Sequence, residues 1–255
     1  MPDLIEANMN QLTTASNYGF SGVGLDSLGA SEYTLATIVT DISGSVTNWK
    51  KPLEECLKAI VGSCQSSPRS DNLMLRLVSF NSKVEEVHGF RLLNDIEVSE
   101  YDNSLFPCGL TSLYDATHSA IEATADYAKL LVDQGDMSAN AVVYVITDGI
   151  DNKSTNTPNE IKKLISQVIL DEKLESLAVI LVGVGYSDGT TSDYLDKFKD
   201  AAEINQFVDL TELFSNGSPD KALAKLAGYV SKSISSTSTA LAGGSASVSS
   251  SLLTF

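Results

Sequence analysis

The sequence predicts an α/β fold with a mostly parallel central sheet, one antiparallel edge strand and helices on both faces. Three apolar, β-branched runs support this prediction, at residues 33–40, 141–147 and 177–184. Runs of this kind are typical of strands that are buried on both faces of a sheet. Helical patterns lie between the runs, and strand–helix–strand crossovers of ordinary length place successive strands parallel.

The N-terminal part of the chain looks different from the rest. Residues 1–32 are polar and interrupted by glycines, so we predict an N-terminal arm with a short helix around residues 4–12. The strand at residues 33–40 follows. A helix is expected over residues 47–63, because its apolar positions repeat with helical spacing.

A hairpin is expected in the next part of the chain. Residues 72–80 alternate well enough for a strand that leaves Arg76 on a polar side. A polar turn then leads into residues 84–87, which predicts an antiparallel edge strand. Residues 90–106 are acidic and without a period, so a long surface connection is expected there.

Helices and strands alternate through the second half of the chain. A long helical pattern covers residues 112–132. Thr157 and Glu160, with Pro158 between them, form a capping box before the helix at residues 158–171. Further elements are expected as a helix capped by Ser192 and ending near residue 202, a short strand at residues 206–209 and a last helix at residues 219–233.

Composition divides the chain into three parts. We predict a single domain over residues 33–232, between the arm at residues 1–32 and a tail at residues 233–255. The tail consists mainly of serine, threonine, alanine and glycine, a composition that favours disorder.

Charge and cysteine content exclude several classes of function. The net charge of the 255 residues is −16, so nucleic acid and anionic membranes are poor partners. Cys56 and Cys64 fall on one expected helix, about 12 Å apart along its axis, which excludes a disulfide between them. The chain shows no signal-peptide pattern and no apolar run of about 20 residues. We therefore expect a soluble cytoplasmic protein.

The strand at residues 33–40 ends in a group of oxygen-bearing side chains. Asp41, Ser43 and Ser45 follow it at alternate positions. Ligands of open α/β sheets bind beyond the carboxyl ends of the strands. One carboxylate and two hydroxyls at that place suit a hard cation such as Mg²⁺.

Two later segments offer the same chemistry. Asp148 directly follows the apolar run at residues 141–147, and Thr111 precedes the long helix at residues 112–132. Taken singly, Ser43 and Ser45 are also typical helix caps, and Asp148 with Gly149 is also typical of a turn. Five such residues on three separate segments favour a metal site.

This set of residues resembles the metal-ion-dependent adhesion site of von Willebrand factor A (vWA) domains. The matching residues are Asp41, Ser43, Ser45, Thr111 and Asp148, and the resemblance covers residues 33–232. It implies a Rossmann-like vWA fold that binds Mg²⁺, with Mn²⁺ or Ca²⁺ as alternatives. It also implies a protein partner that presents an Asp or Glu side chain to the metal. The chain resembles bacterial stand-alone vWA proteins more than secreted members.

Neighbouring acidic residues have two interpretations each. Asp115 lies one helical turn after Thr111, where it is either support for the site or a charge at the helix start. Asp151 and Asn152 lie close to Asp148 and either line the rim of the site or are ordinary surface residues.

Two other functions remain open. A metal-dependent phosphohydrolase of the haloacid-dehalogenase type would use Asp41, although Ser43 stands where that family has a second acid. A structural subunit of a larger particle would use its terminal segments to join homo- or hetero-oligomers. No P-loop pattern is present, and His88 and His118 lack the accompanying residues of a catalytic triad. We therefore expect a non-enzymatic interaction module.

Overall fold

The computed structural model describes residues 8–185, 189–210 and 219–242. Its strands are β1 (Met9–Thr13), β2 (Gly19–Val23), β3 (Glu32–Asp41), β4 (Leu73–Phe80), β5 (Val84–Leu92), β6 (Ser138–Thr147), β7 (Ser176–Gly183) and β8 (Gln206–Asp209). Its α-helices are α1 (Lys50–Gln65), α2 (Leu113–Gly135), α3 (Pro158–Leu170), α4 (Gly189–Ala202) and α6 (Pro219–Ala242).

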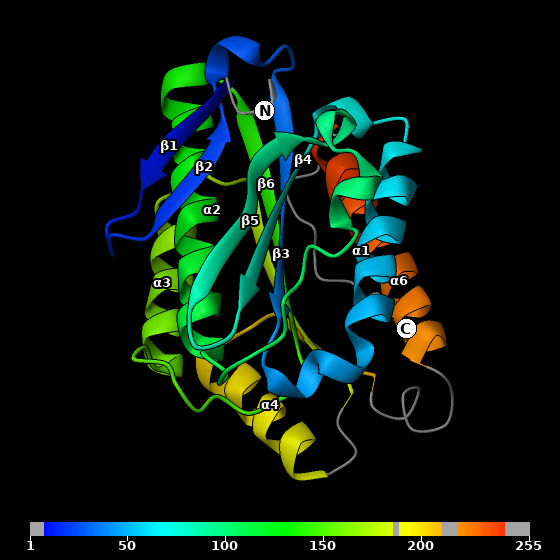
Figure 1. Cartoon of the computed structure of the whole chain (residues 1–255). Helices are drawn as coiled ribbons and strands as arrows, with labels where there is room; N and C mark the ends of the chain where they lie inside the picture. Colours follow the sequence, from blue (N-terminus) through cyan, green and yellow to red (C-terminus); the bar gives the residue numbers. More distant parts are fainter. Residues whose placement is uncertain (1–7, 186–188, 211–218, 243–255) are drawn as a thin grey trace.

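The strands form one sheet between two layers of helices (Figure 1). The strand order is β1-β2-β5-β4-β3-β6-β7-β8. Helices α1 and α6 pack on one face of the sheet, and α2, α3 and α4 cover the other. Each face of the sheet has its own apolar core. Strands β3, β4, β6, β7 and β8 are parallel, so their carboxyl ends lie at one edge of the sheet. This architecture confirms the predicted α/β fold class.

The antiparallel strand predicted after residue 80 exists but does not lie at the edge. β5 runs antiparallel to β4, and β2 joins its other side through a bridge between Gly22 and Phe90. The edge strand is β1, which pairs antiparallel with β2.

The N-terminal segment is therefore a hairpin in the sheet, and the predicted short helix is wrong for residues 9–12; residues 4–7 lie outside the described part of the chain. Gly22 allows a close approach to α2, because an added Cβ would lie 2.4 Å from Tyr127 Cε2. The Tyr127 hydroxyl donates to the carbonyl of Val23 at 2.8 Å. Long-range packing of this kind holds a glycine-containing strand that has little strand propensity of its own.

Arg76 is fully buried, in contrast to the polar side predicted for it. Its Nε donates to Glu86 Oε2 at 2.7 Å, and its Nη2 donates to the Tyr18 hydroxyl at 3.1 Å. Its guanidinium also lies 5.5–5.9 Å from the ring centroids of Tyr18, Phe20 and Phe90. The ion pair and the rings replace part of the water that the charge loses on burial, and Nη1 of Arg76 is left without a hydrogen bond to the described residues.

Residues 90–92 of the predicted surface connection belong to β5, and residues 93–106 form the connection but anchor it in the core. Leu93, Ile96, Tyr101 and Leu105 are buried in the core on the α1 side. Gln65 at the end of α1 donates to the carbonyls of Leu93 and Ile96. This packing could not be predicted from the sequence, because the apolar residues lie in and beside short 3-10 turns and show no regular spacing.

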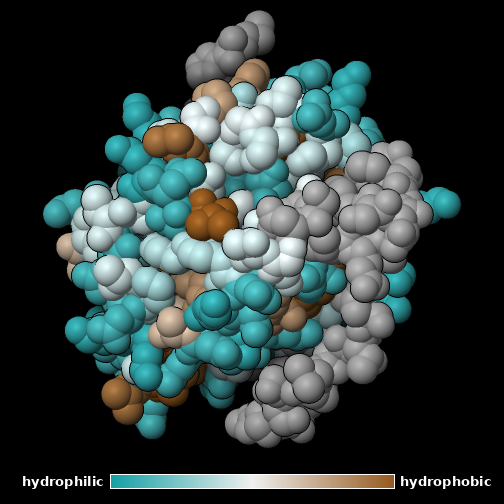
Figure 2. Space-filling model, turned by 90° about the horizontal axis from the view of Figure 1, so that it is seen from below, coloured by the Kyte–Doolittle hydropathy of each residue, from teal (hydrophilic) through white to brown (hydrophobic). Residues whose placement is uncertain are grey.

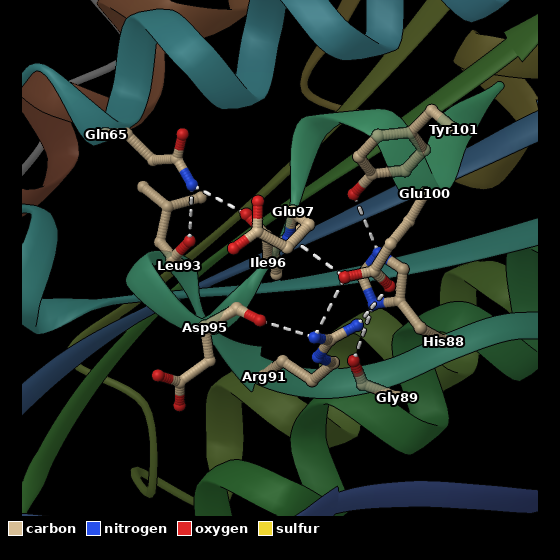
Figure 3. Close-up of polar contacts among 10 residues, drawn as sticks. All are labelled: Gln65, His88, Gly89, Arg91, Leu93, Asp95, Ile96, Glu97, Glu100 and Tyr101. Carbon is tan, nitrogen blue, oxygen red and sulfur yellow. Dashed lines mark hydrogen bonds and ion pairs between the residues drawn. The ribbon is translucent and has the colours of Figure 1, made fainter. Parts of the chain in front are cut away.

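A polar cluster joins β5 to this segment (Figure 3). Arg91 donates to both carboxylate oxygens of Glu100 and to the carbonyl of Asp95. The two ring nitrogens of His88 lie 2.9 Å from the carbonyl of Gly89 and 2.8 Å from the Tyr101 hydroxyl. Because a carbonyl only accepts, Nδ1 of His88 carries the proton and Nε2 accepts from Tyr101.

The C-terminal helix is longer than predicted. α6 continues to Ala242, so residues 233–242 of the predicted disordered tail are helical, with Ile234 and Thr237 buried. Thr237 and Ser231 donate to carbonyls four residues earlier, which satisfies their hydroxyls within the helix. The rest of the tail, residues 243–255, lies outside the described residues.

Smaller expectations have mixed outcomes. The capping box of Thr157 and Glu160 is present, and Cys56 and Cys64 are unpaired, as predicted. The prediction that Ser192 caps a helix is wrong, because α4 already begins at Gly189. Among the described helices, none combines the length and the apolar character that crossing a membrane requires.

Candidate metal centre

Asp41 is the last residue of β3, at the centre of the sheet, and it is fully buried. Its Oδ1 accepts a hydrogen bond from the backbone N–H of Ser43 at 2.7 Å. Its Oδ2 accepts from the hydroxyl of Thr147 at 2.7 Å. Both carboxylate oxygens are therefore fixed, one by its own loop and one by the neighbouring strand β6.

The two serines connect Asp41 to the end of β6. Ser45 donates its hydroxyl to Asp148 Oδ1 at 2.9 Å, and Ser43 Oγ lies 3.0 Å from Ser45 Oγ. Because Ser45 gives its one proton to Asp148, its oxygen is free to accept from the Ser43 hydroxyl. The side chains of Ser43, Ser45 and Asp148 thus form a continuous chain of hydrogen bonds.

The tight turn after β3 arises from its backbone contacts. The N–H of Ile42 donates to the carbonyl of Phe80, and the N–H of Gly44 donates to the carbonyl of Gly109. A 3-10 helix begins at Gly44 and leads into α1. These bonds place the serine loop between the end of β4 and the segment that carries Thr111.

Thr111 lies beside the loop that follows β6. A Cβ atom added at Gly149 would lie 3.9 Å from Thr111 Oγ1. The backbone N–H of Thr111 donates to Asn152 Oδ1 at 2.8 Å, and its carbonyl accepts from the N–H of Asn152 at 3.0 Å. Four of the five predicted residues are joined by hydrogen bonds in which a side chain takes part, and Thr111 is attached through its backbone.

The site concentrates negative charge. Burial, and then the charge of Asp148, raise the pKa of Asp41 to about 6. Burial also raises the pKa of Asp148, while hydrogen bonds from Ser45 and Trp49 oppose that rise. Among the described residues, neither carboxylate takes part in an ion pair. Two carboxylates and neutral hydroxyls form a donor set that fits a hard divalent cation.

The neighbouring acids bind the protein itself. Asp115 accepts from the backbone N–H groups of Thr155 and Asn156, and Asp151 accepts from the N–H of Tyr114 and from Ser154. Both acids therefore hold the loop after β6 against the start of α2.

Sequence reasoning missed Thr147 and offered Asn152 only as a residue at the rim of the site or an ordinary surface residue. Thr147 ends the strand beside β3, where a residue that reaches Asp41 is expected once the parallel register is known. No local pattern singled out either residue.

The face at which the parallel strands end is largely hydrophilic, with isolated apolar residues (Figure 2). Ser45 is exposed on the turn after β3, whereas Ser43 and Thr111 are nearly covered, at 3% and 5% exposure.

The sequence pattern of the von Willebrand factor type A domain matches residues 37–216 of the chain. The chain belongs to this family. vWA domains are metal-dependent adhesion and protein-interaction modules that bind a divalent metal at a site of this kind. No curated protein sequence matches the chain.

Solved structures of low sequence identity share the vWA fold. The PilB minor pilin from Streptococcus sanguinis has a TM-score of 0.58 at 14% identity, over 84% of this chain and 64% of the pilin. The SpaC pilus adhesin from Lactobacillus rhamnosus GG has a TM-score of 0.55 at 12% identity, over 82% and 31%. Proximal thread matrix protein 1 from the mussel byssus has a TM-score of 0.50 at 18% identity, over 82% and 47%. The vWA chain spans less than two thirds of each of these proteins.

Proposed function

We propose that this vWA chain is a metal-dependent protein–protein interaction module, an adaptor or an assembly component. A divalent cation would be held at the carboxyl ends of the strands by Asp41, Ser43, Ser45, Thr111 and Asp148. Mg²⁺ is the first candidate, and Mn²⁺ and Ca²⁺ are alternatives because all three accept oxygen ligands. The partner is a protein that presents the carboxylate of an Asp or Glu side chain.

The observation that carries this proposal is the convergence of Asp41, Ser43, Ser45 and Asp148 in one hydrogen-bonded group without a positive charge. Holding two carboxylates close together in a buried place costs free energy. A bound cation would remove that cost. The energy therefore favours metal binding over a purely structural role for these residues.

The composition of the site explains why an external anion would bind. Only two of the five proposed side chains are acidic, and hydroxyl groups are neutral ligands. A divalent cation in such a site remains electrophilic and gains from one more carboxylate. When bound, the metal would supply that attraction. The chain's own residues would hold the cation in place and exclude water from the side of the cation that faces the protein.

The phosphohydrolase alternative is disfavoured by the state of Asp41. A nucleophilic carboxylate must meet the phosphorus atom directly, whereas a carboxylate can stabilise a cation through a bridging water. Asp41 is fully buried, and each of its oxygens accepts a hydrogen bond within the protein. The particle-subunit alternative and the cytoplasmic location stay predictions.

Thermal unfolding tests the metal site. At a free Mg²⁺ concentration one hundred times the dissociation constant, binding stabilises the folded state by about 2.7 kcal/mol. For a domain of this size we expect the melting temperature to rise by about 5–10 °C. Asp41→Ala should abolish the rise, and Asp200→Ala, at an exposed carboxylate far along the chain, should leave it intact. A wild-type melting temperature that ignores Mg²⁺, Mn²⁺ and Ca²⁺ would contradict the proposal.

A pull-down from native lysate, with and without chelator, then tests the partner. We expect a protein that is retained with metal, released by chelator and not captured by Asp41→Ala. Replacing the partner's acidic residues should abolish capture. Capture that is unchanged by chelator would count against a metal-mediated contact.

A further inference from the structure

The loop between β6 and α3, residues 149–157, holds Thr111 by both hydrogen-bonding groups of its backbone. Asn152 accepts from the N–H of Thr111 through its side chain and donates to the carbonyl of Thr111 through its own N–H, at 2.8 and 3.0 Å. The orientation of a residue's backbone fixes the direction of its Cα–Cβ bond. Asn152 therefore determines where the Thr111 side chain points, which is beside Gly149.

This arrangement leaves the Thr111 hydroxyl available. Thr111 is only 5% exposed, yet no hydrogen bond from its hydroxyl reaches any residue in the described part of the chain. The Thr111 hydroxyl oxygen is not among the fully buried oxygens that lack a partner in the described part of the chain, so it can be reached from solvent. Here the backbone groups are satisfied by Asn152, and the hydroxyl is left beside the residues that follow Asp148.

The same loop also caps α2. Ser112, at the N-cap position, makes no side-chain hydrogen bond to the helix. Instead, Asp151 accepts from the N–H of Tyr114 at 3.2 Å, and Ser154 accepts from the N–H of Asp115 at 3.0 Å. Groups that an α-helix leaves unpaired at its start are therefore satisfied by the β6–α3 loop. The helix start and the loop are thus joined by several hydrogen bonds.

We propose that Asn152 is a positioning residue for the metal centre, which aligns Thr111 with Asp148 so that both offer oxygens to the same cation. This inference rests on the proposed function of the site. Asn152 does not touch the cation in this proposal. It acts through Thr111, and residues that orient metal ligands commonly change metal affinity by 10–100-fold when replaced.

The chain offers a matched pair of variants to test this role. Asn152→Ala removes the acceptor of the Thr111 N–H. Asn156→Ala removes a residue of the same type from the same loop, whose side chain bonds Asp115 and, among the described residues, makes no bond to Thr111. Asn152→Asp keeps an oxygen acceptor at the same place. Mn²⁺ affinity of the full chain, measured by calorimetry and by electron paramagnetic resonance, is the readout, together with the melting temperature without metal.

We expect Asn152→Ala to weaken Mn²⁺ binding about tenfold, with a metal-free melting temperature close to that of the wild type. The Mn²⁺ affinity of Asn156→Ala should stay within about twofold of the wild-type value. Asn152→Asp should bind Mn²⁺ at least as tightly as Asn156→Ala does. In a Thr111→Ala background, Asn152→Ala should cause no further loss, because its effect passes through Thr111.

Several outcomes would overturn this inference. Equal losses from the Asn152 and Asn156 variants would indicate general loosening of the loop. A loss that persists in the Thr111→Ala background would show that Asn152 acts by another route. If Asp41→Ala also leaves Mn²⁺ binding unchanged, the metal centre itself is wrong. If Asp41→Ala abolishes binding while Asn152→Ala has no effect, only the positioning role fails.

Discussion

The candidate metal centre and the polar cluster on β5 both bring ionisable groups together but balance their charges differently. In the β5 cluster, Arg91 is paired with Glu100, and a neutral His88 is bonded to Tyr101 (Figure 3). In the metal centre, Asp41 and Asp148 lie near each other, and no ion pair to either is present among the described residues.

This difference separates a structural cluster from a binding site. A cluster that contains its own counter-charges gains nothing from an external ion. A site that retains excess negative charge is less stable alone and is stabilised when a cation arrives. Opposite responses to substitution and to acid should therefore distinguish the two regions.

The largest expected effect comes from breaking the balanced cluster. Arg91→Met removes hydrogen bonds to Glu100 and to the Asp95 carbonyl from a side chain that is only 9% exposed. We expect the free energy of unfolding to fall by about 3 kcal/mol. Urea denaturation measures it, with Lys162→Met as the control. Lys162 forms an exposed ion pair with Glu203, and its loss should change stability by less than about 1 kcal/mol. Equal effects would contradict the structural role of the cluster.

Acid should weaken the same cluster. Burial lowers the pKa of His88 to about 4, from 6.5 in an exposed histidine. Between these values the unfolded chain binds a proton that the folded chain does not, so stability falls as the pH drops through this window. We expect His88 to cost about 2 kcal/mol by pH 5 relative to pH 7.

The comparison of wild type with His88→Gln isolates this contribution. Urea denaturation in chelator should show a smaller loss between pH 7 and pH 5 for the variant. If both proteins lose the same stability, His88 is not held neutral by the fold.

The metal centre should respond to acid in the opposite direction. The pKa of Asp41 is raised to about 6, above its usual 3.8, so its charge destabilises the metal-free fold at pH 7. That penalty disappears as the pH falls through 6 towards 4. We expect Asp41→Asn to stabilise the metal-free protein at pH 7 by about 1 kcal/mol, with no gain at pH 4. Denaturation in chelator at the two pH values checks this. If metal-free Asp41→Asn is less stable than the wild type at pH 7, the metal centre does not hold a destabilising excess of negative charge.

Sequence reasoning succeeded where the signal is local. The runs that became β3, β6 and β7 are apolar along their whole length, so their burial on two faces could be predicted from composition alone. The five proposed metal residues could be selected because Asp41 and Asp148 directly follow such runs.

The failures occurred where a distant partner decides the structure. Arg76 is buried because Glu86 and Tyr18 lie beside it, and neither is recognisable from the strand that carries it. The β1–β2 hairpin depends on Gly22 fitting against Tyr127, about a hundred residues away. Asn152 was noticed only as a residue near Asp148, because its contact with Thr111 arises from the fold.

The parallel pairing of β3 with β6 has a consequence for biosynthesis. The two strands are separated by about a hundred residues, and a parallel pair cannot form until the whole crossover between them has been made. Asp41 therefore leaves the ribosome long before Thr147 and Asp148, its neighbours at the strand ends. During that interval the first strands expose apolar surface that β6 later covers, which is the kind of surface that chaperones protect on a nascent chain.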